Sequence, residues 1–368
     1  MMNDTIHTGL LVGLLLLGLA ACDSSGEIRD PDAAGSENTC VVPRDQFVDG
    51  GVGKDGIPAL TDLPFVTPDE AAYLADTDRV IGFLIDGRAL AVPHNVLWSH
   101  EIINLNFETI QLAVTYCPLT GSSMVFDRAA IGGSEFGGSG LLFQNNLTMY
   151  DRTTSESIWP QMSRQVACGP RLGASLTMRP AIEMTWGGWK TLYPDTRVSS
   201  DETGFGWSYT AANYPYGNYE DPNDGGLLFP MDIDPRRAPK ERVLGIPDDR
   251  TGGTAFPFFE LDADGPVRAL HGSVAGAPVV VLWDRAFQGA MAFQPSLDGQ
   301  SMTFEVRQGR IIDTGTESTW RLDGMAVEGP LAGAQLTPVA EAYVAFWFAW
   351  AAFHPETRIW EAGSAAGE

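Results

Sequence analysis

Cys117 is the residue around which a chemically active site is most readily built. The apolar run Leu112–Val114 predicts a strand, and Pro118 ends it because proline has no N–H group to donate to a sheet. Leu119–Gly121 then predicts a turn, and Ser123–Asp127 predicts the returning strand. A thiol at such a junction is held by a rigid sheet and can still face a cleft. Cys117 is therefore the first candidate for catalysis or metal binding.

His100 could act with this thiol in either of two chemistries. A thiolate, an imidazole and a thioether form a ligand set suited to copper, so Cys117, His100 and Met149 are one hypothetical metal site. The other hypothesis is covalent thiol chemistry, with Cys117, His100 and Glu101 as the catalytic residues. There His100 lowers the pKa of the thiol, and Glu101 or Asp127 orients the imidazole. The structural alternative is that Cys117 is a small buried residue and His100 hydrogen-bonds the backbone.

A second group of polar residues could line a ligand pocket: Ser139, Asn145, Asn146 and Tyr150. A few such groups fix the orientation of a small molecule in a pocket that is otherwise apolar. The alternative is that Gly, Ser and Asn build turns here, as they do elsewhere. The competing function is therefore a non-catalytic module that binds a small ligand or an envelope partner. It would use these residues and the Tyr-rich segment 214–219.

Composition limits the classes of function. The net charge of −24 at pH 7 excludes a nucleic-acid-binding protein, which needs a basic surface. Hydrophobic residues make up 44% of the chain, enough for packed cores and too many for general disorder. Neither a Walker phosphate loop nor a dinucleotide-binding glycine fingerprint occurs.

The N-terminal residues predict export and a lipid anchor. Leu10–Leu19 is almost wholly apolar, as in a secretory signal. Leu19-Ala20-Ala21-Cys22 resembles the lipobox of bacterial lipoproteins, although Met1–Gly9 carries no Lys or Arg. The resemblance implies that residues 1–21 are a signal peptide and that lipidated Cys22 attaches the protein to a membrane of the cell envelope, on the extracytoplasmic, periplasmic side. A plain cleaved signal is the alternative. Residues 22–40 are polar and predict a flexible tether.

Lipidation of Cys22 would leave three cysteines, an odd number for an oxidising compartment. One disulfide and one free thiol is the simplest arrangement. A bridge between Cys40 and Cys168 would leave Cys117 free, but the sequence alone leaves the pairing open.

The same order of motifs occurs twice along the chain. Val114–Phe126 aligns with Val281–Phe293 without a gap, and Trp186–Trp189 aligns with Trp347–Trp350. A one-residue slip then sets Phe353 against Tyr193. The prediction is an α+β, β-dominated fold of two pseudo-repeated halves, each closed by an aromatic helix whose rings lie in the core. The predicted segments are a first repeat (residues 41–200), a connecting loop rich in Tyr, Gly and Asp (201–240), a second repeat (241–361) and a C-terminal tail (362–368).

The two copies differ at the proposed site. Cys117 faces Asp284 in the second copy, and Trp98–Glu101 has no recognisable counterpart there. Where the copies agree, the fold is the simplest reason. Where only one copy carries a reactive group, a function could explain the difference. The first repeat is therefore the candidate active half.

Several separate motifs resemble the DUF3179 family of bacterial and archaeal proteins, a domain of unknown function. The resemblance covers roughly residues 42–360 and brings no assigned activity. Relatives carry a second Cys at the position of Thr120, giving Cys-x-x-Cys, and lack a counterpart of Cys168. The Thr at position 120 implies that a dithiol mechanism does not apply to this chain. The motifs are Lys54–Pro58, Trp98–Ile102, Thr115–Gly121, Phe136–Leu142, Met149–Arg152, Ser157–Trp159, Gly329–Gly333 and Phe353–Pro355.

Overall fold

The computed structural model describes residues 39–248 and 251–361. The predicted signal peptide (1–21), the lipidation site Cys22, residues 23–38 of the predicted tether and the tail 362–368 lie outside the described residues. Within the described ranges, no helix is both long and apolar enough to cross a membrane.

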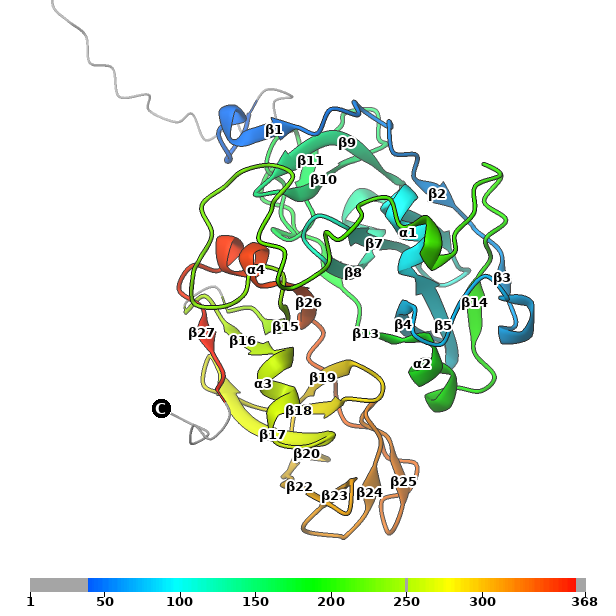
Figure 1. The fold of residues 1–368 in the computed structure, drawn as a ribbon, viewed down its shortest axis with the longest axis vertical. Helices are drawn as coiled ribbons and strands as arrows, with labels where there is room; N and C mark the ends of the chain where they lie inside the picture. The colour runs from blue at the N-terminus through cyan, green and yellow to red at the C-terminus, as the bar shows by residue number, and fades with distance from the viewer. Residues whose placement is uncertain (1–38, 249–250, 362–368) are drawn as a thin grey trace, which may run out of the picture.

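The described residues form a β-dominated fold with several sheets and a few short helices, as the sequence predicted (Figure 1). The strands are rich in Val, Ile, Leu and aromatic residues, which favour extended backbone. The helices are one to two turns long and follow directly on strands. They are α1 (His94–His100), α2 (Trp186–Leu192), α3 (Phe258–Ala263) and α4 (Trp347–Phe353).

Residues 41–200, called the first half below, contain three sheets. Their strands, in spatial order, are β1 (Phe47–Asp49), β9 (Phe136–Phe143), β10 (Asn146–Asp151) and β11 (Ile158–Pro160); then β12 (Thr177–Met178), β8 (Ser122–Asp127), β7 (Gln111–Cys117), β6 (Ile102–Asn106) and β2 (Leu60–Thr61); then β13 (Ala181–Thr185), β4 (Arg79–Ile85), β5 (Arg88–Pro93), β14 (Arg197–Ser199) and β3 (Phe65–Val66).

Residues 241–361, the second half, form further sheets, and among the described residues no sheet pairs strands of both halves. The strands are β26 (Tyr343–Phe346), β15 (Arg242–Ile246), β16 (Thr254–Pro257) and β27 (Arg358–Ile359); then β17 (Val267–Val274), β18 (Ala277–Asp284) and β19 (Gly289–Phe293); then β22 (Phe304–Arg307), β23 (Arg310–Asp313), β24 (Thr319–Trp320) and β25 (Ala326–Glu328); and the small pair β20 (Ser296–Leu297) and β21 (Gln300–Ser301).

The same contacts fix the closing helix of each half. The Trp189 indole donates to the Thr196 hydroxyl at 2.7 Å, and the Trp350 indole donates to the Thr357 hydroxyl at 2.9 Å. Each helix is preceded by an antiparallel strand that pairs with the first long strand of its sheet, β13 with β4 and β26 with β15.

The alignment of the two helix ends needs a correction. The Tyr193 amide donates to the Trp189 carbonyl at 2.9 Å, and the His354 amide donates to the Trp350 carbonyl at 2.9 Å. Tyr193 therefore corresponds to His354, and the predicted one-residue slip to Phe353 is wrong. Sequence alignment favoured the slip because it paired two aromatic residues, whereas the hydrogen bonds keep a single offset.

Each closing helix packs on the first long strand of its own half and borders a buried core that both halves share. Trp186 and Trp189 of α2 share a buried cluster with Leu282 of β18 in the second half. Trp347 and Trp350 of α4 share one with Phe126 of β8 in the first half. Figure 1 shows β26, the strand before α4, lying close to β8 of the first half. The two halves therefore share two apolar cores.

Backbone hydrogen bonds between the halves follow the same reciprocal arrangement. The Phe346 amide before α4 donates to the Thr120 carbonyl at 2.8 Å, and the Thr185 amide before α2 donates to the Phe287 carbonyl at 2.9 Å. Thr120 and Phe287 lie in the turns of the β7–β8 and β18–β19 hairpins. Each helix therefore begins beside a hairpin turn of the other half.

A glycine on the first long strand of each half admits the helix indole. A methyl group added to Gly82 would overlap the Trp189 ring, and one added to Gly245 would overlap the Trp350 ring. Neither position has a positive φ, so the constraint is space and not backbone conformation.

We expect Gly82→Ala and Gly245→Ala each to lower the free energy of unfolding by about 1–3 kcal/mol, the usual cost of overpacking a core. Urea unfolding followed by tryptophan fluorescence measures the change. Gly272→Ala is the matched control, because its added methyl would lie 3.8 Å from the nearest Val279 carbon. Equal midpoints for all three variants would contradict the close packing.

Candidate functional site

Cys117 ends β7, and the turn and returning strand β8 follow as the sequence predicted. Its side chain is fully buried, and the Leu147 amide donates to the sulfur at 3.3 Å. The thiol lies 3.8 Å from the Asn145 carbonyl, to which it donates. Burial, together with the nearby Glu101 carboxylate, raises the pKa of the Cys117 thiol to about 11. In this geometry Cys117 is a protonated thiol that supports the turn between β9 and β10.

The disulfide joins Cys40 to Cys168, and Cys117 is free. This is one of the pairings that the sequence left open. The bridge links the segment before β1 to the loop after β11.

His100 ends α1 and makes its contacts elsewhere. Its Nδ1 lies 2.8 Å from the Pro58 carbonyl, and its Nε2 lies 2.7 Å from the Tyr209 hydroxyl. A carbonyl only accepts, so Nδ1 carries the proton and Nε2 accepts from Tyr209. Burial lowers the pKa of His100. Both ring nitrogens are therefore engaged, and neither is directed at Cys117.

The predicted copper ligands are accordingly not assembled in this conformation. Met149 is fully buried on β10 and pairs with Trp159 of the neighbouring strand. Its thioether belongs to the same core as Cys117, but His100 supplies no free nitrogen there. Throughout residues 39–248 and 251–361, no three His, Cys, Asp or Glu side chains gather as a metal-ligand group.

Two of the predicted ligand-binding residues serve the fold. The Ser139 hydroxyl donates to the Thr148 carbonyl at 2.6 Å, across the irregular part of the β9–β10 pairing. The Tyr150 hydroxyl donates to the Asp55 carboxylate, which also accepts from Arg152 at 2.7 Å. Tyr150 thus fixes the turn around Asp55, which belongs to the Lys54–Pro58 motif.

The two predicted asparagines have different roles. Asn146 is fully buried, and its amide donates to the Thr120 hydroxyl at 3.0 Å and to Gln161 at 2.8 Å. It holds the β7–β8 turn against β10. Asn145 instead donates to the Phe229 carbonyl at 2.9 Å, so it connects the first half to the 201–240 segment.

Glu101 has the environment expected of a functional residue. It follows α1 with a φ of 57°, and its amide donates to the Leu97 carbonyl at 2.8 Å. Its side chain is buried, with 7% of the residue exposed, and burial raises the pKa of the carboxyl group to about 8. Among the described residues, nothing forms a hydrogen bond or ion pair with that carboxyl group. A positive φ in a non-glycine residue costs about 1–3 kcal/mol, and such strain and strongly shifted pKa values gather at functional sites.

Glu101 lines a cavity of about 310 Å³, within the size range of small-molecule pockets. None of the lining residues is Arg, Lys or His, and Glu101 is the one carboxyl group among them. Val52 and Leu228 are 48% and 55% exposed, so they mark the mouth, while Glu101 lies at the buried end. The cavity is therefore an apolar pocket with an acid at its base. The other lining residues are Gly50, Gly53, Ile57, Leu119, Gly138, Gly140, Leu141, Leu142, Leu147, Tyr216 and Phe229.

The connecting segment 201–240 contributes to the wall of this cavity and bridges the two halves. Tyr216, Leu228 and Phe229 come from it. The Tyr219 hydroxyl donates to the Leu119 carbonyl at 3.0 Å. The hydrogen bond from Asn145 to the Phe229 carbonyl also holds the segment in place. Burial and the Glu101 carboxyl raise the pKa of Tyr216, which places its phenol close to the acid.

Sequence reasoning therefore found the neighbourhood and missed the lining. It singled out Glu101 and the Tyr-rich segment, whose Tyr216 lines the cavity. The four predicted ligand-binding residues do not line it: Ser139, Asn145, Asn146 and Tyr150. It did not single out Leu119, Leu142 or Leu147, because an aliphatic residue that faces a cavity cannot be told from one that faces the core.

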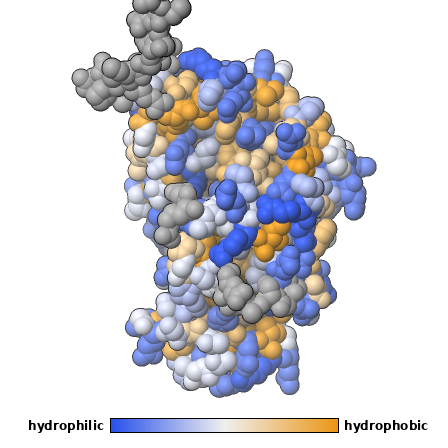
Figure 2. All heavy atoms as spheres, turned by 90° about the vertical axis from the view of Figure 1, so that its left-hand side faces the viewer, coloured by the Kyte–Doolittle hydropathy of each residue, from blue (hydrophilic) through white to orange (hydrophobic). Residues whose placement is uncertain are grey.

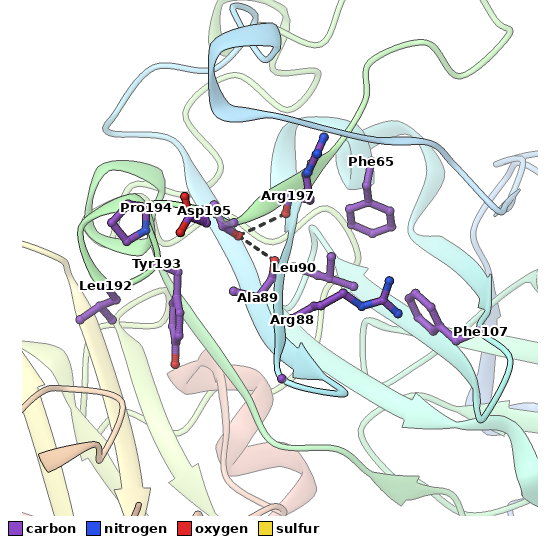
Figure 3. A pocket seen from close by; sticks show the side chains of 12 residues that line it. Phe65, Arg88, Ala89, Leu90, Phe107, Leu192, Tyr193, Pro194, Asp195 and Arg197 are labelled. Atoms are coloured by element: carbon purple, nitrogen blue, oxygen red, sulfur yellow. Dashed lines mark hydrogen bonds between the residues drawn. The ribbon is translucent and has the colours of Figure 1, made fainter. Parts of the chain in front are cut away.

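A larger groove of about 660 Å³ lies at the β4–β5 turn and the end of α2 (Figure 3). Arg88 and Arg197 are exposed there, and Figure 3 shows the Arg88 side chain extending toward Phe107. None of the predicted site residues lines this groove. The groove is open to solvent. The Glu101 cavity contains a predicted site residue whose pKa is raised by burial, so it is the better candidate.

The fold and the site thus define a β-rich protein with an acid at the base of an apolar cavity. The chain belongs to the DUF3179 family, described as proteins of unknown function, whose model matches residues 54–357. The match spans the Lys54–Pro58 turn, the connecting segment and both closing helices. No curated protein and no solved structure matches the chain.

We expect Glu101→Gln to remove a pH dependence from stability. The pKa of Glu101 rises on folding from its ordinary value of 4.5 to about 8, so the native state binds more protons between these values. The free energy of unfolding therefore falls as pH rises through this window, by roughly 3–5 kcal/mol at about 1.4 kcal/mol per pKa unit.

Urea unfolding at pH 5 and pH 8.5 measures the effect in both proteins. The difference between wild type and Glu101→Gln should favour the variant at the higher pH, because other titrating groups contribute equally to both. A pH-independent difference would show that Glu101 is ionised in the native state.

Proposed function

We propose that this protein binds a small, largely apolar ligand in the Glu101 cavity, and that it does so as a lipid-anchored protein of the cell envelope. The observation that carries the binding function is the unpaired carboxyl group of Glu101 at the base of an apolar cavity. Burial in the cavity disfavours the ionised carboxyl group and raises its pKa to about 8. A ligand that fills the cavity and pairs with Glu101 would stabilise the ionised form.

The thiol- or metal-dependent site around Cys117 stays a prediction. The binding function is favoured over it because Cys117 is buried with a raised pKa, and His100 is engaged by Pro58 and Tyr209. Thiol chemistry would require a conformation in which the β9–β10 turn leaves the sulfur.

The disulfide supports the proposed location. Structural disulfides persist in oxidising compartments and are rare in a reducing cytosol. The Cys40–Cys168 bridge closes a loop over 128 positions and starts close to the end of the predicted tether. The lipobox-like sequence before Cys22 would place the folded part on the same side of the membrane.

We also propose that the halves are copies of one ancestral unit. The matching indole–hydroxyl bonds of Trp189 and Trp350 support this, and so do the reciprocal amide bonds of Phe346 and Thr185. A single copy would leave its part of the two shared cores uncovered, which argues that both copies are needed for folding.

Ligand binding can be tested with Nile red, a neutral apolar fluorophore. We expect its fluorescence to rise on binding to the wild-type protein, and Gly138→Phe to abolish most of the rise by filling the cavity. A Cβ at position 138 meets only the Ile57 carbonyl, at 3.6 Å, so the backbone tolerates a side chain there.

Gly272→Phe controls for the added ring, since Gly272 lies in the second half and away from the cavity. Circular dichroism checks that both variants fold. An equal response from wild type and Gly138→Phe would mean that the dye binds elsewhere and would contradict the proposal.

The membrane attachment has a separate test. We expect the full-length protein to fractionate with membranes when expressed in a bacterium that processes lipoproteins, and Cys22→Ala to release it or block its processing. Cys117→Ala is the matched control, because it removes a cysteine from the folded part. Membrane attachment that survives Cys22→Ala would refute the lipid anchor.

A further inference from the structure

We infer that the ligand of the Glu101 cavity is an amphiphile with a protonated amine head and an apolar tail, the amine pairing with the Glu101 carboxylate. This inference rests on the proposed binding function and specifies its ligand. The evidence is the charge inventory of the cavity, its shape and the exposure of its mouth.

The charge inventory excludes anionic ligands. A carboxylate or phosphate needs a cationic side chain or several directed N–H groups, and no Arg, Lys or His lines the cavity. At its base an anion would instead meet Glu101. The net charge of −24 acts in the same direction, since it lowers the local concentration of anions and raises that of cations.

The groups that face Glu101 leave its charge uncompensated. Cys117 of β7 and Tyr216 of the connecting segment both interact electrostatically with it, and both have raised pKa values and are neutral near pH 7. His100 precedes it in the chain but is directed to Pro58 and Tyr209. Burial is accordingly the cause of the raised pKa of Glu101.

A cationic head would supply the missing partner. An ammonium group donates hydrogen bonds to a carboxylate, and an ion pair in a buried site needs both charges to be present. When the amine enters, the carboxyl group gives up its proton to solvent, so the complex contains R–NH₃⁺ and Glu101–COO⁻. The ring of Tyr216 borders the same space and can add a cation–π contact.

The mouth fits an apolar tail. Val52 and Leu228 are about half exposed, and Leu141 and Phe229 line the cavity beside them. Val48 of β1 is 47% exposed and pairs with Leu142 of the lining. Figure 2 shows hydrophobic patches among hydrophilic residues on one face of the molecule. An alkyl chain that leaves the cavity would therefore lie on an apolar rim.

Three ligands of equal chain length test the inference: n-octylamine, 1-octanol and octanoate. Isothermal titration calorimetry at pH 7 in two buffers of different ionisation enthalpy gives both affinity and the number of protons exchanged. We expect octylamine to bind most tightly and to release close to one proton, 1-octanol to bind more weakly without proton release, and octanoate not to bind. Glu101→Gln should weaken octylamine roughly tenfold or more and leave 1-octanol within a few-fold.

The outcomes separate the inference from the function on which it rests. If 1-octanol binds as tightly as octylamine, or octylamine binds without releasing a proton, the cavity is a ligand site and the amine class is wrong. If none of the three binds, the proposed function fails as well. The proton release is measured on the wild-type protein, so it tests the inference even if Glu101→Gln does not fold.

Discussion

The buried carboxylate of Glu183 joins the two halves of this protein. Arg79 of β4 lies 2.6 Å from it and Arg242 of β15 lies 3.2 Å from it, so one arginine comes from each half. Burial alone would raise the pKa of Glu183, but the two guanidinium groups and His94 lower it to about 2. The group is therefore ionised throughout the physiological range. Removing it would leave two arginines buried together, which is far costlier than losing a surface ion pair.

The charge cluster is central because the two halves share buried cores around it. The indoles of α2 and α4 belong to these shared cores, and the amide preceding each helix is bonded to a hairpin turn of the other half. Each half also keeps a core of its own, on the other face of its sheets. Alternating residues of β4 serve the two purposes, since Val80 belongs to the shared core and Ile81 to the internal one. The period of two along a strand thus lets one sheet serve both cores.

Much of this fold could be predicted from residue types and spacing. The β7–β8 hairpin followed from an apolar run ended by Pro118, and the closing helices followed from indoles at helical spacing before a proline. The sharing of cores between the halves could not be predicted, because a buried Trp looks the same whichever half covers it. The failure at His100 has a similar cause: sequence proximity to Cys117 suggested a pair, but α1 turns the ring toward Pro58 and the connecting segment.

The sequence indicated Glu101 only as a residue that could orient His100. Its unusual feature in the structure is its positive φ of 57°. In the second half, α3 is followed by Asp264 with a φ of −109° and then by Gly265 with a φ of 131°, a conformation that glycine adopts without steric cost. The first half places a glutamate at the end of α1 with a φ of 57°. If only the chain reversal mattered, glycine would serve equally well in both halves. The strain is therefore best explained by the side chain, which the reversal holds at the base of the cavity. The shared cores and the Glu183 cluster supply stability that offsets this strain in the first half.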